Sequence, residues 1–507
     1  MSPAAPVLPH VQPTVVQMLA AAAAAAPKTE ALVFGERRLD YAGYLACVAA
    51  FACELQSMGA KGGRVATLMG NSSDACIAAL ASLAAGAQQV PLNPLYTAHE
   101  LGAIFEDAAP AVLVVDAALA AMAEPLARRA GVAHVVIVGE GARRLDERPA
   151  GDVDLPPVPA TQALALLQYT GGTTGRAKGV ELTHGAIAIN VAQREALLPT
   201  RSGDRILCMM PLSHAYAMAM GLFLSLNCAG TLVILARYQP DEVLAAVTHE
   251  RIGVFLGSPT IFTGLLAHPG FAASDWHTVH TCYSGSAALA ESTLTRWREA
   301  VGAPVYEGYG LTEAGPVLTF NPVHGPVKPG SVGVPVPLTE IEVVDVETGE
   351  KVLPAGSRGE IRARGPQLMR GYRNRSEETS LALRKGWLYT GDIGVFDADG
   401  YLAILDRKKD MVNVGGYNVY PREVEEVLFS HPDVADAAVV GRPDSYRGEV
   451  LVAYVVPRPG ARPRAEALLA HCRERLAKYK LPAQWHFVTA LPKTPANKTD
   501  KNALRRS

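Results

Sequence analysis

The chain contains 507 residues, and 49% of them are hydrophobic. A length of this order exceeds what one hydrophobic core serves, so two or more domains are expected. Its 47 basic and 49 acidic side chains give a formal net charge of −2, which offers no general attraction to nucleic acid or to an anionic membrane.

Short strands and helices alternate along the first half of the chain. Strands are predicted from apolar and β-branched runs at 31–34, 35–40, 64–68, 111–115 and 133–138, and again around Leu207, Leu232, Val254 and His280. Helical periodicity covers 41–58, 73–85 and 186–198. Strands separated by helices of about 10–15 residues predict parallel sheets covered on both faces. The expected fold class is therefore α/β.

Two apolar stretches resemble export or membrane segments. The alanine run 20–26 has no basic cluster before it, so an amphipathic opening helix is expected. The stretch 215–236 carries no charge, but it contains Gly230, and 232–235 predicts a buried strand. No integral membrane span is expected. Seven scattered cysteines without a Cys-x-x-Cys pair favour reduced thiols in a cytoplasmic enzyme.

The pattern of the chain changes after Gly330. Short strands at 339–345, 359–364 and 401–405 lie between Gly, Pro and Asp turns and predict a compact β-rich subdomain. Five charged residues at 406–410 follow. They form either a surface turn or an interdomain hinge.

A small mobile α/β domain is predicted at the C-terminal end. Its expected helices and strands are 421–430, 435–441, 449–457 and 465–478. We therefore expect an N-terminal domain of residues 1–408 and a C-terminal domain of residues 409–507, with the hinge at Lys409.

The stretch 168–179 contains four glycines and three threonines. Because it lacks large side chains, its backbone N–H groups and hydroxyls can converge on phosphate oxygens. It is not a Walker P-loop, because two residues separate Gly175 from Lys178. Its residues alone leave two interpretations open, a triphosphate cradle or an ordinary Gly-rich turn.

Four further patches suit nucleotide chemistry. The stretch 306–313 offers an aromatic ring for stacking a base and a carboxylate for a metal ion. Asp392 is an acceptor of the kind that binds ribose hydroxyls, and Arg407 adds a fixed cation. Lys498 lies in a polar loop that prolines hold.

Together these motifs resemble the adenylate-forming superfamily, which includes acyl-CoA synthetases, adenylation domains of peptide synthetases, and luciferase. The matching motifs are Thr170-Gly-Gly-Thr-Thr-Gly-Arg-Ala-Lys-Gly179, Tyr309-Gly-Leu-Thr-Glu313, Tyr389-Thr-Gly-Asp392, Asp406-Arg-Lys-Lys-Asp410 with Gly415-Gly416, and the terminal lysine loop. Within the superfamily, 167–175 and 406–421 look most like bacterial long-chain fatty acyl-CoA ligases.

The resemblance implies a two-step reaction. The carboxylate of a small-molecule acid attacks the α-phosphate of Mg·ATP, giving acyl-AMP and pyrophosphate. The thiol of coenzyme A then attacks the acyl carbonyl and expels AMP. ATP, Mg²⁺ and coenzyme A are therefore expected, and the site must neutralise developing charge in an in-line geometry.

The resemblance also implies roles for the matched residues. The nucleotide-binding set comprises Thr170, Gly171, Gly172, Thr173, Thr174, Gly175 and Lys178 at the phosphates, Ser286, Ala287, Ala288 and Tyr309 at the adenine, Asp392 and Arg407 at the ribose, and also Gly310 and Thr312 of the Tyr309 motif. Glu313 would hold Mg²⁺ with Thr170 or Thr174. Lys498 would bridge the carboxylate and the α-phosphate. Lys178 would order the loop or touch the leaving pyrophosphate, although a solvated lysine also fits.

The C-terminal domain would rotate about Lys409 between the two steps. After rotation, Gly415 and Gly416 would line the route of the pantetheine arm, and Lys498 would have moved away. One departure from the superfamily lies beside that lysine. Asn497 replaces the usual glycine, and Asn tolerates positive φ better than other non-glycine residues.

One segment bears on the identity of the acid. Amino-acid-activating members place an aspartate where this chain has Ala215 and Tyr216, so an α-amino acid is disfavoured. His214 matches the residue beside the acyl carboxylate and joins Glu313 and Lys498 as a catalytic candidate. A structural histidine in a helix N-terminal turn is the alternative. Open volume along the pocket is expected from small residues, namely Ala215, Ala217, Ala219, Gly221, Ser284, Gly285, Ala314 and Gly315.

A fatty acid of medium or long chain is the leading expectation, and an aromatic or arylalkanoic acid is the alternative. The compact run from Gly371 to Arg407 favours free coenzyme A, because members that load carrier proteins often carry an insertion before the hinge. Transfer to an acyl carrier protein is the remaining alternative. No nucleic acid partner is expected, and the sequence leaves a homodimer open.

Overall fold

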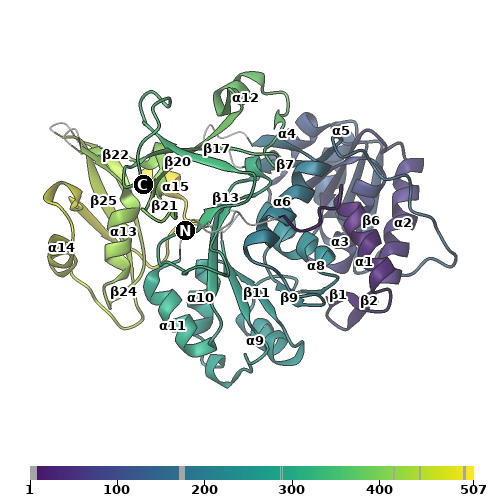
Figure 1. The fold of residues 1–507 in the computed structure, drawn as a ribbon, viewed down its shortest axis with the longest axis horizontal. Helices are drawn as coiled ribbons and strands as arrows, with labels where there is room; N and C mark the ends of the chain where they lie inside the picture. Colours follow the sequence, from purple (N-terminus) through teal and green to yellow (C-terminus); the bar gives the residue numbers. More distant parts are fainter. Residues whose placement is uncertain are drawn as a thin grey trace.

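The computed structural model describes residues 8–170, 177–285, 287, 289–414, 417–444, 447–494 and 498–506. Over these ranges the strands form four sheets, of nine, seven, five and five strands. The predicted α/β class, with a large N-terminal domain and a smaller C-terminal domain, is confirmed. The C-terminal elements, in yellow-green, form a lobe beside the N-terminal sheets (Figure 1).

The seven-stranded sheet has the order β18-β8-β7-β4-β3-β5-β6. Its strands are β3 (Arg64–Leu68), β4 (Gln88–Leu92), β5 (Val112–Asp116), β6 (His134–Val138), β7 (Leu164–Thr170), β8 (Lys178–Thr183) and β18 (Gly371–Tyr372). Strand β3 occupies the predicted residues and pairs in parallel with β4 and β5. Strands β7 and β8 form an antiparallel hairpin. Helices α4 (Ala98–Ala108) and α5 (Ala117–Arg129) belong to the same part of the chain.

The nine-stranded sheet has the order β15-β14-β13-β12-β11-β9-β10-β1-β2. Its strands are β1 (Glu30–Phe34), β2 (Arg37–Asp40), β9 (Arg205–Cys208), β10 (Thr231–Ile234), β11 (Val254–Gly257), β12 (Thr281–Ser284), β13 (Val305–Gly310), β14 (Val317–Phe320) and β15 (Val334–Pro335). The six strands from β1 to β13 in the sheet order are parallel. Helices α9 (Pro240–His249), α10 (Pro259–Leu266) and α11 (Glu291–Val301) connect strands of this sheet.

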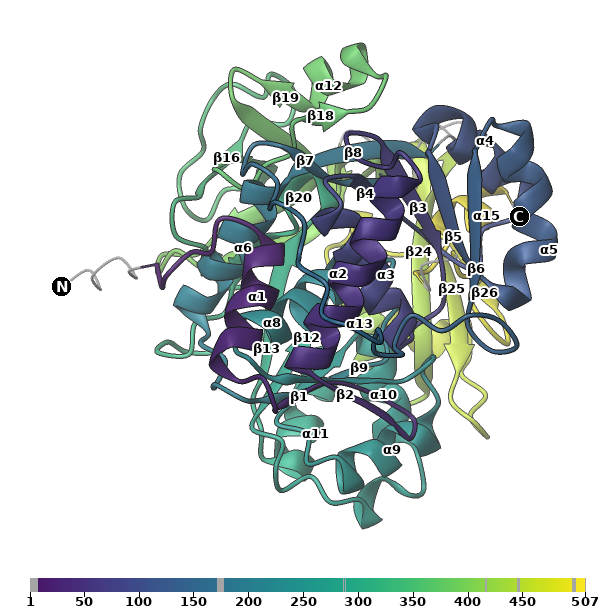
Figure 2. The same ribbon diagram turned by 90° about the vertical axis from the view of Figure 1, so that its right-hand side faces the viewer.

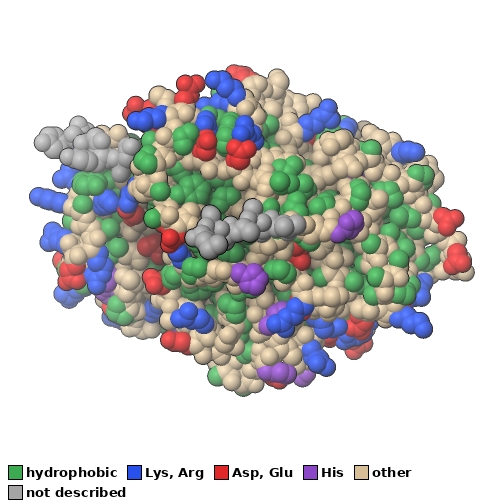
Figure 3. All heavy atoms as spheres, in the orientation of Figure 1, with side chains coloured by type: hydrophobic (Ala, Val, Ile, Leu, Met, Phe, Trp, Pro, Cys, Tyr) green, Lys and Arg blue, Asp and Glu red, His purple; other side chains and the backbone are tan. Residues whose placement is uncertain are grey.

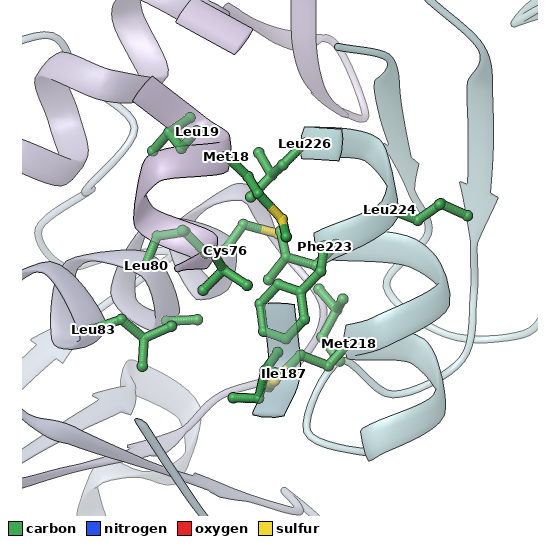
Figure 4. Close-up of a cluster of buried hydrophobic side chains, with 14 of the residues drawn as sticks. Met18, Leu19, Cys76, Leu80, Leu83, Ile187, Met218, Phe223, Leu224 and Leu226 are labelled. Atoms are coloured by element: carbon green, nitrogen blue, oxygen red, sulfur yellow. The ribbon is translucent and has the colours of Figure 1, made fainter. Parts of the chain in front are cut away.

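One hydrophobic cluster joins the two large sheets through helices α1 (Val15–Ala25), α2 (Tyr41–Ser57), α3 (Ser73–Ala84) and α6 (His184–Leu197). Helices α1 and α2 run side by side (Figure 2). Met18, Cys76, Ile187 and Phe223 converge in this cluster (Figure 4), and each is at most 2% exposed. Burial of a side chain of this kind contributes about 1.5–3 kcal/mol.

The uncharged stretch 215–236 belongs to the same core. It forms α7 (Ala215–Ala217), a π-helix (Met218–Phe223), α8 (Leu224–Asn227) and the predicted strand β10. Neighbouring elements therefore cover its apolar side chains. Within the described ranges, no helix has both the length and the apolar character needed to cross a bilayer.

The β-rich subdomain and the C-terminal domain follow in the chain. The subdomain contains β16 (Glu340–Val344), β17 (Gly359–Arg364), α12 (Ser376–Ala382), β19 (Leu383–Arg384), β20 (Trp387–Phe396) and β21 (Leu402–Arg407). The C-terminal part contains β22 (Val412–Val414), β23 (Tyr417–Val419), α13 (Pro421–Phe429), β24 (Val434–Asp444), β25 (Gly448–Pro457), α14 (Ala465–Arg473), β26 (Gln484–Phe487) and α15 (Lys501–Arg506). The helix predicted at 465–478 ends at Arg473, because the chain then turns to pack Leu476, Tyr479 and Leu481 on the domain core.

Candidate active site

The Gly-rich stretch joins the two strands of the β7–β8 hairpin. Thr170 at the end of β7 pairs with Lys178 at the start of β8. The predicted phosphate-binding residues between them, Gly171, Gly172, Thr173, Thr174 and Gly175, lie outside the described residues. The hairpin thus places Thr170 and Lys178 at the same end of the two strands, and the roles of the intervening residues remain predictions.

Three predicted residues from separate motifs meet where a ribose was expected. The Tyr309 hydroxyl donates a hydrogen bond to Asp392 Oδ2 at 2.5 Å, and Arg407 Nε lies 2.8 Å from Asp392 Oδ1. The antiparallel register of β20 and β21 pairs Asp392 with Arg407. Burial raises the pKa of Asp392, whereas the charge of Arg407 and the Tyr309 hydrogen bond oppose that rise.

The backbone near the predicted adenine site is tightly packed. A Cβ on Gly310 would lie 1.7 Å from the Pro316 carbonyl oxygen, so only glycine fits there. Thr312 begins a short 3₁₀ helix (Thr312–Ala314) directly after β13. Ala287 is exposed, while Ser286 and Ala288 lie outside the described residues.

Glu313 presents a carboxylate that could contribute to a magnesium site. Its Oε1 accepts a hydrogen bond of 2.9 Å from the Tyr372 hydroxyl, and its backbone carbonyl accepts one of 2.8 Å from Met369 N–H. In the described ranges, no group of three or more His, Cys, Asp or Glu side chains could hold a metal ion. Mg²⁺ commonly uses one or two carboxylates together with substrate phosphates. The donor chemistry of Glu313 and Thr170 therefore fits Mg²⁺ bound with a nucleotide.

Lys178 makes contacts that the sequence does not predict. Its Nζ lies 2.6 Å from Glu378 Oε2 and 5.1 Å from the centre of the Tyr372 ring. Tyr372 reaches this position because β18 pairs with β8. Sequence reasoning missed Tyr372 and Glu378, and the only signal was their place shortly after Gly371 in a polar segment.

Lys498 enters the site from the C-terminal domain. Part of the residue is exposed to solvent. The surrounding protein atoms nevertheless exclude enough water from its ammonium group to lower the pKa of Lys498. The charge of Arg407 lowers that pKa further, and Asp392 opposes the change. Burial also lowers the pKa of His214 to about 4, and the charge of Lys498 contributes to this shift. Lys498 therefore lies close enough to His214, Arg407 and Asp392 to interact with them electrostatically.

His214 has a structural contact as well as a position near Lys498. It caps the N-terminus of α7, where its Nδ1 accepts a hydrogen bond of 3.2 Å from the Tyr216 N–H. With its pKa near 4, the ring is neutral at pH 7. The cap agrees with the structural alternative, and the nearby Lys498 agrees with the catalytic one.

The expected open volume is not seen at three of the small residues. A Cβ on Gly285 would lie 2.7 Å from the Tyr216 ring, and one on Gly315 would lie 2.8 Å from the Gln367 carbonyl oxygen. A Cβ on Gly221 would be in ordinary contact with core side chains. These glycines accommodate close neighbours, so the expectation that they enlarge the acid pocket is wrong.

The predicted hinge lies between two anchored residues. Lys408 Nζ is 2.8 Å from Glu360 of β17, and Arg505 of α15 is 2.6 Å from Asp410. Lys409 between them is exposed. Gly415 and Gly416 lie outside the described residues, so their role beside pantetheine remains a prediction.

A large surface depression of about 860 Å³ lies elsewhere, at the amino ends of the parallel strands. Arg38 and Arg205 at its edge pair with Glu30 and Glu250. Ligands of open α/β sheets bind at the carboxyl ends of the strands, where His214 and Tyr309 lie, so we do not assign chemistry to this depression. Acidic and basic side chains are interspersed on the face shown in Figure 3.

Two family models match successive parts of the chain. The model described as AMP-binding enzyme matches residues 19–373, and the model described as AMP-binding enzyme C-terminal domain matches residues 423–498. The chain belongs to the AMP-binding enzyme family. The resemblance to the adenylate-forming superfamily is therefore confirmed.

Relatives within the AMP-binding family span almost the whole chain. The long-chain-fatty-acid–CoA ligase of Bacillus subtilis (strain 168) is 36% identical, covering 98% of this chain and 96% of the relative. The feruloyl-CoA synthase of an Amycolatopsis species is 37% identical, covering 95% and 96%. The crystal structure of ATP-bound MatB from Rhodopseudomonas palustris has a TM-score of 0.90 at 32% identity, covering 97% and 98%.

Proposed function

We propose that this AMP-binding enzyme is an AMP-forming ligase that joins a carboxylic acid to coenzyme A through an acyl-AMP intermediate. The observation that carries the proposal is the approach of Lys498, from the C-terminal domain, to Asp392, Arg407 and His214 of the N-terminal domain. That arrangement puts a cation beside an acceptor suited to ribose, as an adenylation site requires.

Each side chain has a proposed role in the first step. Asp392 accepts hydrogen bonds from the ribose hydroxyls, and Tyr309 and Arg407 hold its carboxylate in place. Lys498 lies between the acid and the α-phosphate and neutralises the charge that develops there. The first step joins a carboxylate oxygen to the α-phosphorus and breaks its bond to the pyrophosphate oxygen.

Glu313 and Thr170 would hold Mg²⁺, which neutralises phosphate charge when bound. Tyr372 orients the Glu313 carboxylate through its hydroxyl. This outer partner leaves Glu313 Oε2 for a cation. The donor set supports a magnesium requirement without a complete protein cage.

The second step requires Lys498 to leave. We propose rotation about Lys409, because Lys408 is tied to Glu360 on the N-terminal side and Asp410 is tied to Arg505 on the C-terminal side. The thiol sulfur of coenzyme A then bonds to the acyl carbon, and AMP leaves with the oxygen that had joined it to the acyl group.

A fatty acid of medium or long chain is the proposed substrate, and the whole-chain similarity to the Bacillus subtilis ligase supports it. An aromatic or arylalkanoic acid is the second candidate, because the feruloyl-CoA synthase relative is equally similar. We further propose a cytoplasmic location. A homodimer and transfer to an acyl carrier protein remain alternatives.

A panel of C2 to C18 fatty acids and aryl acids tests the proposal. We expect acid-dependent pyrophosphate release, and a thioester detected by mass once coenzyme A is added. Turnover of cinnamate-like or benzoate-like acids with inert fatty acids would favour the second candidate. If acyl-AMP persisted unchanged after coenzyme A was added, coenzyme A would not be the acceptor of the acyl group.

A further inference from the structure

Four side chains from four separate segments form a continuous polar cluster. Glu378 of α12 pairs with Lys178 of β8 at 2.6 Å, Lys178 lies over the ring of Tyr372, and Tyr372 donates to Glu313. Helix α12 lies beside β18 (Figure 2). The cluster links a predicted phosphate ligand to a predicted magnesium ligand.

The position of Glu378 is fixed by its surroundings. Thr379, its neighbour in α12, accepts a hydrogen bond of 2.9 Å from Tyr372 N–H and donates one of 2.8 Å to the Arg375 carbonyl. Arg375 Nη1 also lies 3.6 Å from Glu378 Oε1. Glu378 is half-buried, whereas the preceding Glu377 is exposed. These contacts hold Glu378 where it can pair with Lys178, whereas the adjacent Glu377 points to solvent and pairs with no described residue.

We propose that Glu378 is the resident counter-ion of Lys178 and competes with the phosphates of ATP and with pyrophosphate for that ammonium group. The proposal rests on the proposed function, which brings a triphosphate to this hairpin. Before nucleotide binds, Glu378 holds Lys178 over Tyr372. When phosphate oxygens approach, they replace the carboxylate, and when pyrophosphate leaves, Glu378 takes the ammonium back.

Competition follows from the chemistry of the groups. A lysine ammonium carries one positive charge, and a carboxylate oxygen within 3 Å of it balances much of that charge. Phosphate ligands must displace that carboxylate, so part of their binding free energy is offset. The same contact lowers the affinity for the leaving product. Glu378 is thus a positioning residue. It weakens the binding of ATP and at the same time favours the release of pyrophosphate.

The Tyr372 hydroxyl donates to Glu313 Oε1, while the ring of Tyr372 faces Lys178. The hydrogen bond to Glu313 therefore does not depend on which partner Lys178 has. This separation predicts that loss of Glu378 changes phosphate affinity without removing the outer partner of the magnesium ligand.

Glu378→Gln tests the proposal, with Glu377→Gln as the matched control on the same helix. Titration calorimetry with Mg·pyrophosphate and with Mg·ATP should show roughly 2- to 5-fold tighter binding by Glu378→Gln. Glu377→Gln should match the unaltered protein. Lys178→Gln should bind more weakly, and the Lys178→Gln, Glu378→Gln double variant should match Lys178→Gln, because no ammonium remains to be released.

Unchanged or weaker phosphate binding by Glu378→Gln would overturn the competition, as would a double variant that still binds more tightly than Lys178→Gln. Circular dichroism of each variant controls for folding, and a merely structural role predicts weaker binding. The proposed function is judged separately, by acid-dependent pyrophosphate release in the unaltered enzyme. Binding of Mg·ATP without such release would contradict that function but not the competition.

Discussion

Lys178 and Lys498 come from different domains and differ in how their charges are balanced. Lys178 belongs to a hairpin of the N-terminal domain and pairs with Glu378 at 2.6 Å. Lys498 comes from the C-terminal domain, and no carboxylate of the described residues forms an ion pair with it within 4.0 Å. Burial and Arg407 lower the pKa of Lys498, which marks an uncompensated cation.

The difference indicates which lysine can act on a reacting group. A paired ammonium is already neutralised, so its removal loses little stabilisation of developing charge. Burial and Arg407 destabilise the charged form of the unpaired Lys498 ammonium. Its interaction energy with an arriving phosphate or carboxylate is therefore larger than that of a paired ammonium. We therefore propose a chemical role for Lys498 and a binding role for Lys178.

Loss of Lys498 is expected to have the largest effect. Lys498→Ala should slow acid-dependent pyrophosphate release by roughly 10²- to 10³-fold, because one preorganised charge is removed from the reacting oxygens. Lys493→Ala is the control, since Lys493 lies in the same loop but pairs with Asp436. If both variants lost the same activity, the loop and not the ammonium would be responsible.

The stability of the folded protein should fall as pH rises, because of a buried carboxyl group on β13. Burial raises the pKa of Glu307 from 4.5 to about 7. The charge of Glu426 of α13 adds to this rise, and the charge of Arg422 of α13 opposes it. Between these values the folded protein holds a proton that the unfolded chain has released, so stability falls as pH rises, by up to roughly 3 kcal/mol.

Glu307→Gln should remove this loss. Urea unfolding of both proteins at pH 5 and pH 8 measures it as a difference in the free energy of unfolding. Equal pH dependence in the two proteins would show that Glu307 ionises normally in the fold.

The hinge should separate the two half-reactions. Lys409→Pro fixes φ at the residue between two anchored neighbours, so ATP–pyrophosphate exchange should persist while thioester formation falls by about 10²-fold. Lys409→Ala should leave both steps near their original rates. Equal loss of both half-reactions in the proline variant would place the hinge elsewhere.

The smallest of these effects is expected in the cluster around Lys178. Tyr372→Phe removes the hydroxyl that holds Glu313, so the Mg²⁺ concentration needed for half-maximal pyrophosphate release should rise roughly 10-fold. Tyr389→Phe is the control, because its hydroxyl donates to the Gly349 carbonyl away from this cluster. An unchanged Mg²⁺ requirement would remove Tyr372 from the metal site.

Much of the fold could be predicted from local pattern. Strand β3 and the starts of α2 and α3 fall on the predicted residues, because apolar periodicity and N-capping by Asp40 and Ser72 agree there. Strand β8 was missed because Gly179 and Glu181 interrupt its apolar pattern. The π-helix Met218–Phe223 has no distinct sequence signature, and tertiary packing decides it.

The site was less predictable than the fold. Asp392 and Arg407 meet through the register of β20 and β21, which the sequence does not specify without the family resemblance. Tyr372 and Glu378 reach Lys178 only because β18 pairs with β8 across nearly two hundred residues. Composition can suggest what such residues bind, but long-range strand pairing determines which of them meet.

Isotope transfer tests the central claim most directly. The enzyme is supplied with Mg·ATP, coenzyme A and an acid whose two carboxylate oxygens are ¹⁸O. Attack on the α-phosphate followed by thiol attack on the acyl carbon leaves one ¹⁸O in AMP, and mass spectrometry should find it there. Thioester formation with ¹⁸O in inorganic phosphate beside ADP, or with unlabelled AMP, would contradict an acyl-AMP mechanism.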